Sequence, residues 1–388
     1  MNVDIKKLEK IIAQNKVYDA WQYVQSLLET LSYMSASYEM LLKVHEHRVN
    51  TLKEIQQGII AEALENGSSK VTASDISKTN LNVGGYELDD AVFLKKTTME
   101  FFHYGRVSMD VLFQITNAAL LGDNAIAVED KGLLKKLLTE LGNTPSFSTL
   151  LSLITNNKNN PNFEYLMAFD NYMKHIKTVL ITVSNSFIIG NSDVFQINSF
   201  TYLGSTYPAV NALDKIKDIH DYILSTVDVI LEEIMKQIPN CISNSQRIQE
   251  IHYKLVFTET EGKSHLNYLS FFIDVPNDIT DLPSEIKVYP LLVKPNDEIY
   301  SFDFRFDKIF IRKTGSDENN IVGVATIKNG INTNEFYRIY EVKACKQIDY
   351  LLYTATFGDT YKAQKMNMNI YAMDGTMLFI KEDNLEEQ

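Results

Sequence analysis

The chain has 388 residues, of which 45% are hydrophobic and 22% charged, a balance that excludes global disorder. Its net charge of -13 argues against wholesale binding to nucleic acid or to an anionic membrane. The charged N-terminus has no apolar signal core, and no apolar run reaches the roughly 18 residues of a membrane span. The two cysteines, Cys241 and Cys345, form no CxxC pair. We therefore expect a cytoplasmic protein with reduced thiols and no membrane partner.

The first long feature is a seven-residue apolar repeat that follows a short amphipathic helix at residues 2–15. The repeat indicates one very long, coiled-coil-like helix over about residues 17–64. Its seam includes Leu31, Leu41 and Leu52. The pattern predicts self-association through these leucines. His45 and Arg48 interrupt the seam, and they either mark the register of the helices or reach a partner or substrate.

The stretch at residues 89–121 is apolar around most of a helical circumference, which predicts a helix in the middle of a core. Asp89 or Asp90 is expected to cap it. The preceding residues 66–88 are rich in glycine, serine and asparagine, and they predict an irregular loop.

More helices are expected after this central one, and they are interrupted by a small hairpin near residues 194–204. The ranges are 130–142, 145–155, 161–190 and 210–238. Proline begins the second and third of them. Polar side chains at helical spacing along 161–190 predict a polar stripe on that helix.

After Ser245 an apolar alternation with period two replaces the helical period. The expected strands are 251–259, 265–275, 285–294, 299–313, 321–328, 335–344, 347–357 and 368–380. The fold class predicted is therefore mixed α+β: an all-α helical bundle at residues 1–245, followed by an antiparallel β-sandwich or barrel at 246–388.

Two polar stripes are the candidate site. His103, Arg106 and Asp110 lie within two turns of the central helix, and Asn171 and His175 lie on the helix expected at 161–190. If the two helices pack antiparallel, these five side chains converge, and the histidines and Arg106 suit acid–base chemistry on an anion. The alternative is that both stripes are ordinary solvated or ion-paired helix faces.

The run of helices between about residues 89 and 238, with the histidine that ends Asn-Tyr-Met-Lys-His, resembles the HEPN family of small helical ribonucleases. The resemblance implies RNA cleavage without a metal, with His175 as general acid or base and Arg106 stabilising the phosphate. That family carries an arginine four to six residues before its histidine. Here the position four before His175 is Asn171.

No nucleotide-binding, hydrolase or metal-ligand motif occurs, so no cofactor and no metal are expected. The sequence therefore favours a cytoplasmic protein–protein interaction or assembly protein, with a helical scaffold and a β recognition module. Its partner would be another protein or a second copy of the chain. DNA is not expected as a partner. The alternative is a HEPN-like ribonuclease, or a toxin or defence-system subunit, with RNA as the partner.

Overall fold

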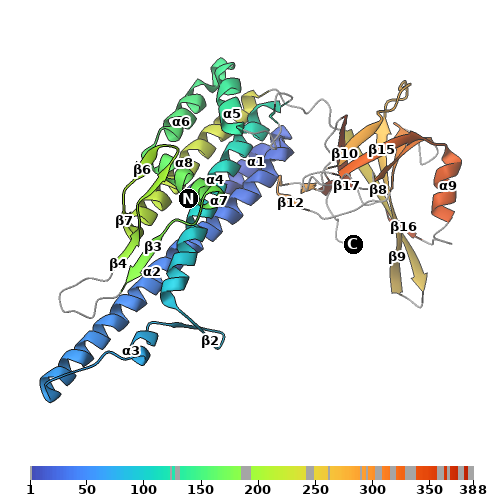
Figure 1. The fold of residues 1–388 in the computed structure, drawn as a ribbon. Helices are drawn as coiled ribbons and strands as arrows, with labels where there is room; N and C mark the ends of the chain where they lie inside the picture. Colours follow the sequence, from blue (N-terminus) through green and yellow to red (C-terminus); the bar gives the residue numbers. More distant parts are fainter. Residues whose placement is uncertain are drawn as a thin grey trace. The chain divides into compact units, whose positions relative to one another are not determined.

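The chain folds into two compact units in a computed structural model (Figure 1). The structure describes residues 2–122, 125–126, 132–184, 194–241, 249–260, 263–288, 291–293, 296–301, 308–314, 320–327, 338–355, 362–364, 368–374 and 380–382. Unit 1 comprises Met1–Val3, Tyr23–Ile115 and Ile126–Ile234. Unit 2 comprises Asp4–Gln22, Thr116–Ala125 and Met235–Gln388. The division into domains at residue 245 stays a prediction.

Helices dominate the first 240 residues, as the apolar periodicity predicts. The helices are α1 (Ile5–Asn15), α2 (Tyr18–Asn66), α3 (Ala73–Ser77), α4 (Asp90–Leu120), α5 (Leu133–Gly142), α6 (Ser148–Lys158), α7 (Pro161–His175), α8 (Ala212–Gln237) and α9 (Gln347–Ala355), with 3-10 turns at Pro145–Phe147 and Ile238–Asn240. Within the described ranges, none of these helices is apolar over a length that would cross a membrane.

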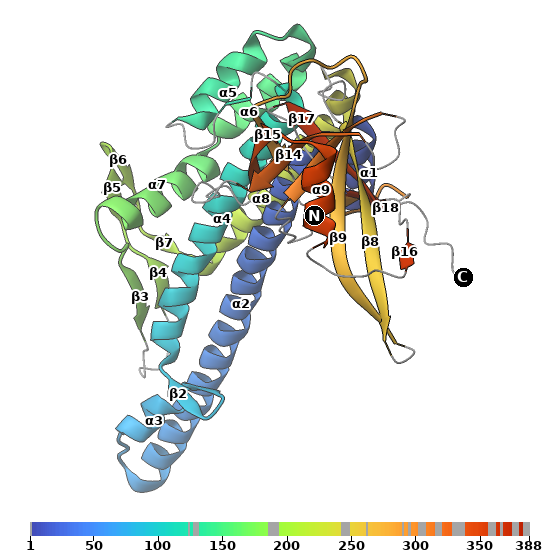
Figure 2. The same cartoon turned by 90° about the vertical axis from the view of Figure 1, so that its right-hand side faces the viewer.

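The long helix predicted from the seven-residue repeat is confirmed as α2, which has 49 residues. It runs alongside α4 in both views (Figure 1, Figure 2). Its seam residues Leu31, Leu41 and Leu52 are buried within one copy of the chain. The seam therefore belongs to the protein's own core. Because these leucines are already buried, they are not exposed for the predicted contact with a second copy.

The central helix is confirmed as α4, and the Asp89 carboxylate caps it by accepting a hydrogen bond from the Val92 N–H at 2.9 Å. The apolar side chains on several of its faces are buried: Leu94, Phe101, Phe102, Met109, Leu112, Phe113 and Ile115. Side chains of neighbouring helices pack closely against Gly105. A Cβ there would lie 2.9 Å from Ile223 Cδ1, on α8.

The helix expected at residues 161–190 is shorter than predicted. Asn160 caps α7, and Pro161 takes its first position, but the helix ends at His175. Residues 181–184 form a strand instead, and 185–190 lie outside the described residues. The reason is a run of β-branched residues, in which Val179 and Ile181 alternate with exposed positions and are buried.

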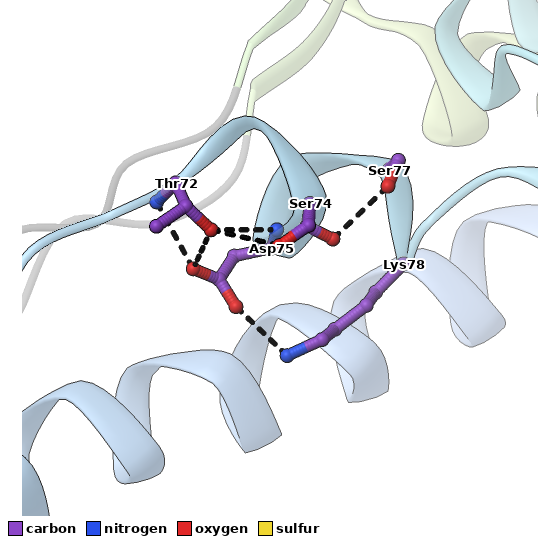
Figure 3. Close-up of polar contacts among 5 residues, drawn as sticks. All are labelled: Thr72, Ser74, Asp75, Ser77 and Lys78. Atoms are coloured by element: carbon purple, nitrogen blue, oxygen red, sulfur yellow. Dashed lines mark hydrogen bonds and ion pairs between the residues drawn. The ribbon is translucent and has the colours of Figure 1, made fainter.

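Residues 66–88, expected as an irregular loop, contain helix α3 and a hairpin of β1 (Leu81–Val83) and β2 (Tyr86–Leu88). A reciprocal cap begins α3: the Thr72 N–H donates to Asp75 at 3.0 Å, and the Asp75 N–H donates to the Thr72 hydroxyl at 3.4 Å (Figure 3). Lys78 Nζ lies 2.8 Å from the same carboxylate. These hydrogen bonds lower the pKa of Asp75, and they give order to a segment whose composition is typical of loops.

The prediction of a hairpin near residues 194–204 is wrong, because the two strands in this range do not pair with each other. The strands are β3 (Ile181–Ser184), β4 (Val194–Ile197), β5 (Phe200–Tyr202), β6 (Ser205–Tyr207) and β7 (Val210–Asn211). β4 pairs with β3 and β7, whereas β5 pairs with β6. Leu203 and Gly204 both have positive φ, as a two-residue type I′ turn requires.

Unit 2 holds a large mixed sheet. Its strands are β8 (Gln249–Thr260), β9 (Lys263–Val275), β10 (Glu285–Val288), β11 (Leu291–Val293), β12 (Ile299–Ser301), β13 (Lys308–Lys313), β14 (Ile321–Ile327), β15 (Arg338–Ala344), β16 (Lys362–Gln364), β17 (Met368–Asp374) and β18 (Ile380–Glu382). Most neighbours are antiparallel, but β9 pairs with β13 and β11 with β18 in parallel. The prediction of a purely antiparallel β domain is therefore wrong. The centre of the strand expected at 299–313 lies outside the described residues.

The strand expected at residues 347–357 is wrong, because Gln347–Ala355 is helix α9. The Asp349 carboxylate accepts a hydrogen bond from the Lys346 N–H at 2.7 Å at the start of the helix. Tyr350 and Tyr353, one turn apart, pack on Phe310 of the sheet. The apolar residues of this segment do not alternate with period two, as a strand requires, but they share one face of a helix. The predicted strand did not take account of this spacing.

Candidate functional site

The polar stripes of α4 and α7 meet at a buried carboxylate. Asp170, on α7, is only 1% exposed, and its Oδ1 lies 3.2 Å from Nδ1 of His103 on α4. Its Oδ2 lies 2.6 Å from Nζ of Lys174, one turn further along α7. A buried carboxylate needs such partners, because an unpaired charge is costly in an apolar interior. Asp170 therefore joins the two helices.

An ion pair between Arg106 and Asp110 continues the site along α4. Partial burial raises the pKa of Asp110, while the positive charge of Arg106 opposes that rise. The charges of Lys174 and Asp170 also act on Asp110, so the pairs of α4 and α7 are electrostatic neighbours. We name these side chains the α4–α7 polar cluster: His103, Arg106, Asp110, Asp170 and Lys174.

The geometry of His103 suits proton transfer. Its Nδ1 faces the Asp170 carboxylate, which orients the imidazole and favours the tautomer with the proton on Nδ1. The side chain is 44% exposed, so the ring remains accessible to solvent. A carboxylate that orients a histidine in this way is the arrangement that supports a general base.

Three of the five predicted site residues therefore come together: His103, Arg106 and Asp110. Asn171 and His175 do not join them, since no hydrogen bond or ion pair between described residues links either one to the cluster. His175 is exposed at the C-terminal end of α7. Within the described part of the chain, no three His, Cys, Asp or Glu side chains are grouped as metal ligands.

Sequence reasoning missed Asp170. It lies between Phe169 and Asn171 and shares the buried face of α7 with Leu166. An acidic residue on an apolar face, with Lys174 at i+4, was the available signal.

A second feature of unit 1 is a set of exposed apolar side chains between residues 64 and 92. Six large apolar residues are exposed there, including Leu64 at 83% and Tyr86 at 76%. The full set, which we name the apolar tip, is Leu64, Val71, Val83, Tyr86, Leu88 and Val92. These residues come from the end of α2, the segment just before α3, the β1–β2 hairpin and the first turn of α4. These elements lie together at one end of unit 1 (Figure 1, Figure 2).

The hairpin of the apolar tip also presents backbone groups. β1 and β2 pair only with each other among the described strands, so each has an outer edge in that part of the chain. An uncovered edge offers N–H and C=O groups to an incoming strand. The apolar tip thus combines exposed apolar side chains with strand edges.

The two residues that interrupt the α2 seam have internal roles. Arg48 forms a buried ion pair with Asp90, with 3% and 4% of the two side chains exposed. His45 stacks on Phe195, with ring centroids 5.6 Å apart. These contacts favour the first alternative, in which His45 and Arg48 fix the register of packed elements, over contact with a partner or substrate.

Comparison with known families gives a match in the second half of the chain. Residues 251–377 match the model of a domain described as "Domain of unknown function (DUF8310)". The matched residues lie within unit 2 and cover about a third of the chain. No curated protein and no solved structure matches the chain.

Proposed function

We propose that this chain is a protein–protein interaction protein that binds its partner through the apolar tip. The observation that supports the proposal is the concentration of six exposed large apolar side chains within 29 residues, 64–92. Large apolar side chains that are exposed at one end of a folded unit are typical of interaction sites. The cytoplasm is the proposed location, because Cys241 and Cys345 are free thiols.

The order of the tip supports the same proposal. The reciprocal cap of Thr72 and Asp75, together with the β1–β2 pairing, holds the segment in one conformation before a partner arrives. A surface ordered in advance loses less conformational entropy on binding. A strand of the partner would extend the hairpin at one edge while apolar side chains cover Tyr86 and its neighbours.

Photo-cross-linking tests this proposal in the cells that make the protein. A photoreactive phenylalanine analogue would replace Tyr86, and in a second variant it would replace Leu203, which is 88% exposed in the turn between β5 and β6. The proposal predicts a discrete cross-linked species from position 86 alone. Leu88→Asp should abolish that species, because a charge would be buried in the contact. Equal yields from both positions, or none from position 86, would refute the proposal.

Cleavage of RNA is a second candidate function, and the contact of His103 with Asp170 favours it. His103 would remove the proton of a ribose 2′-hydroxyl, and the resulting oxygen would attack the adjacent phosphorus. The bond to the 5′ oxygen breaks, and that oxygen takes a proton from water. Arg106 would stabilise the charge on the phosphate. His103, not His175, is the base in this proposal.

A fluorescent RNA oligonucleotide and its 2′-deoxy counterpart test the second candidate. The purified chain should cleave only the RNA, and His103→Ala should remove the activity. Asp170→Asn should lower the rate and change its pH profile, because the imidazole loses its orienting charge. His175→Ala is the matched control on α7 and should retain activity. No cleavage by the wild type, or cleavage that survives His103→Ala, would count against this function.

We also propose that the sheet of unit 2 closes into the barrel form of the predicted β domain, which would serve as the recognition module. The support is that β17 pairs with β10 and, in addition, with β8. Paired cysteines replacing Tyr371 and Glu250, which are register partners, should form a disulfide on oxidation if the barrel closes. Persistent free thiols would contradict closure.

A further inference from the structure

A tight turn fixes the register of the β1–β2 hairpin in the apolar tip. Gly84 and Gly85 both have positive φ, as a type I′ turn requires. The Gly85 N–H donates to Oδ1 of Asn82 at 3.1 Å, which holds the turn closed. Residues that pair across the two strands point to the same face of the hairpin. The pairs are Leu81 with Leu88, Asn82 with Glu87, and Val83 with Tyr86.

This register gives the hairpin one apolar face and one polar face. Successive side chains of a strand point to opposite faces, so both apolar pairs share one face. The pair of Asn82 with Glu87 lies on the other face. All three residues of β2 are exposed, whereas Leu81 at the start of β1 is half-buried. The outer edge of β2 is therefore the more accessible one for an added strand.

The charges of the apolar tip are mostly negative. Lys78 Nζ lies 2.8 Å from the Asp75 carboxylate, so these two charges compensate each other. The other charged residues between positions 62 and 89 are exposed, and they are Glu62, Glu65, Glu87 and Asp89 against Lys70 alone. The tip therefore attracts positive charge and repels a second acidic tip.

The pattern of β2 indicates the chemistry of the partner strand. Apolar side chains opposite Tyr86 and Leu88 would extend the apolar face, and a cation opposite Glu87 would compensate its charge. A second copy of β2, paired antiparallel about Glu87, would instead bring two carboxylates together. We propose that the partner binds through an extended segment in which lysine or arginine alternates with large aliphatic residues. This inference rests on the interaction proposed for the apolar tip and names the chemistry of its partner.

Fluorescence anisotropy with labelled synthetic peptides tests this inference on the full chain. The basic probe is Lys-Val-Lys-Ile-Lys-Val-Lys with both ends blocked, and the acidic probe has glutamate in place of each lysine. The basic probe should bind saturably and at least about tenfold more tightly than the acidic probe, because opposite charges replace like charges. A third probe, with serine in place of the aliphatic residues, should bind at least about tenfold more weakly than the basic probe. Equal binding of the basic and acidic probes, or no saturable binding of the basic probe, would overturn the inference.

Reversing one charge connects the binding to β2. Glu87→Lys should weaken binding of the basic probe at least about threefold and should strengthen binding of the acidic probe. Glu46→Lys makes the same change at an exposed position of α2 outside the apolar tip. At about 0.15 M salt it should change the affinity by less than about twofold, because salt screens distant exposed charges. Circular dichroism establishes that both variants are folded. A folded Glu87→Lys variant that binds the basic probe like the wild type would contradict the inference.

The inference and the proposed interaction fail in different experiments. The cross-link from position 86 does not require a particular charge on the partner, so its absence refutes binding at the apolar tip. If that cross-link forms but the basic and acidic probes bind equally, the apolar tip remains an interaction site. Only the inferred chemistry of the partner is then wrong.

Discussion

The buried ion pair of Arg48 and Asp90 makes a strong prediction about the stability of unit 1. Its side chains are 3% and 4% exposed, so Asp90→Asn removes the negative charge of Asp90 from beside a buried guanidinium group. Removing one partner of such a pair costs about 3–5 kcal/mol. That is a large share of the roughly 5–15 kcal/mol by which a folded domain is stable. Urea unfolding followed by circular dichroism measures the loss.

Two further variants separate this cost from other effects. Glu100→Gln breaks the exposed Lys96–Glu100 pair of the same helix, and it should cost no more than about 0.5 kcal/mol. The double variant Arg48→Met with Asp90→Leu removes both charges, and it should recover most of the loss. If Asp90→Asn costs no more than Glu100→Gln, the pair does not hold α2 and α4 in register.

Glycines and thiols give the remaining predictions. Gly105→Val should destabilise the protein by about 1–3 kcal/mol, because its Cβ would press on Ile223 at 2.9 Å. Gly58→Ala, on α2 with no atom within 4 Å of the new Cβ, should instead stabilise by about 0.5–1 kcal/mol, and thermal unfolding compares the two. Burial raises the pKa of Cys241 and Cys345 to about 11. Their alkylation near neutral pH should therefore be roughly 100-fold slower than that of an exposed thiol. Mass spectrometry measures the labelling rate, and labelling as fast as that of an exposed thiol would contradict the prediction.

The helices that the sequence predicted correctly are those in which apolar periodicity and burial agree. α2 and α4 carry long apolar patterns, and α4 also carries its cap, Asp89, in the sequence. The error after His175 has a physical cause. The polar positions there continue the helical spacing, but the β-branched residues between 178 and 183 favour a strand.

The functional features were harder to predict because they depend on contacts between distant segments. His103 and Asp170 are 67 positions apart, so only the packing of α4 on α7 reveals their contact. Composition predicts a loop at residues 66–88, which form most of the apolar tip, because glycine, serine and asparagine are common there. The exposure of Tyr86 depends on how the hairpin pairs, and local composition does not contain that information.

Hydrogen–deuterium exchange of the complex captured by the cross-linker at position 86 tests the interaction proposal most directly. The β1–β2 hairpin at residues 81–88 and the β5–β6 hairpin at residues 200–207 are both two-stranded sheets of unit 1. A partner that covers the apolar tip should slow amide exchange at 81–88 and leave 200–207 unchanged. Unchanged exchange at 81–88, or equal slowing of both hairpins, would contradict binding at the apolar tip.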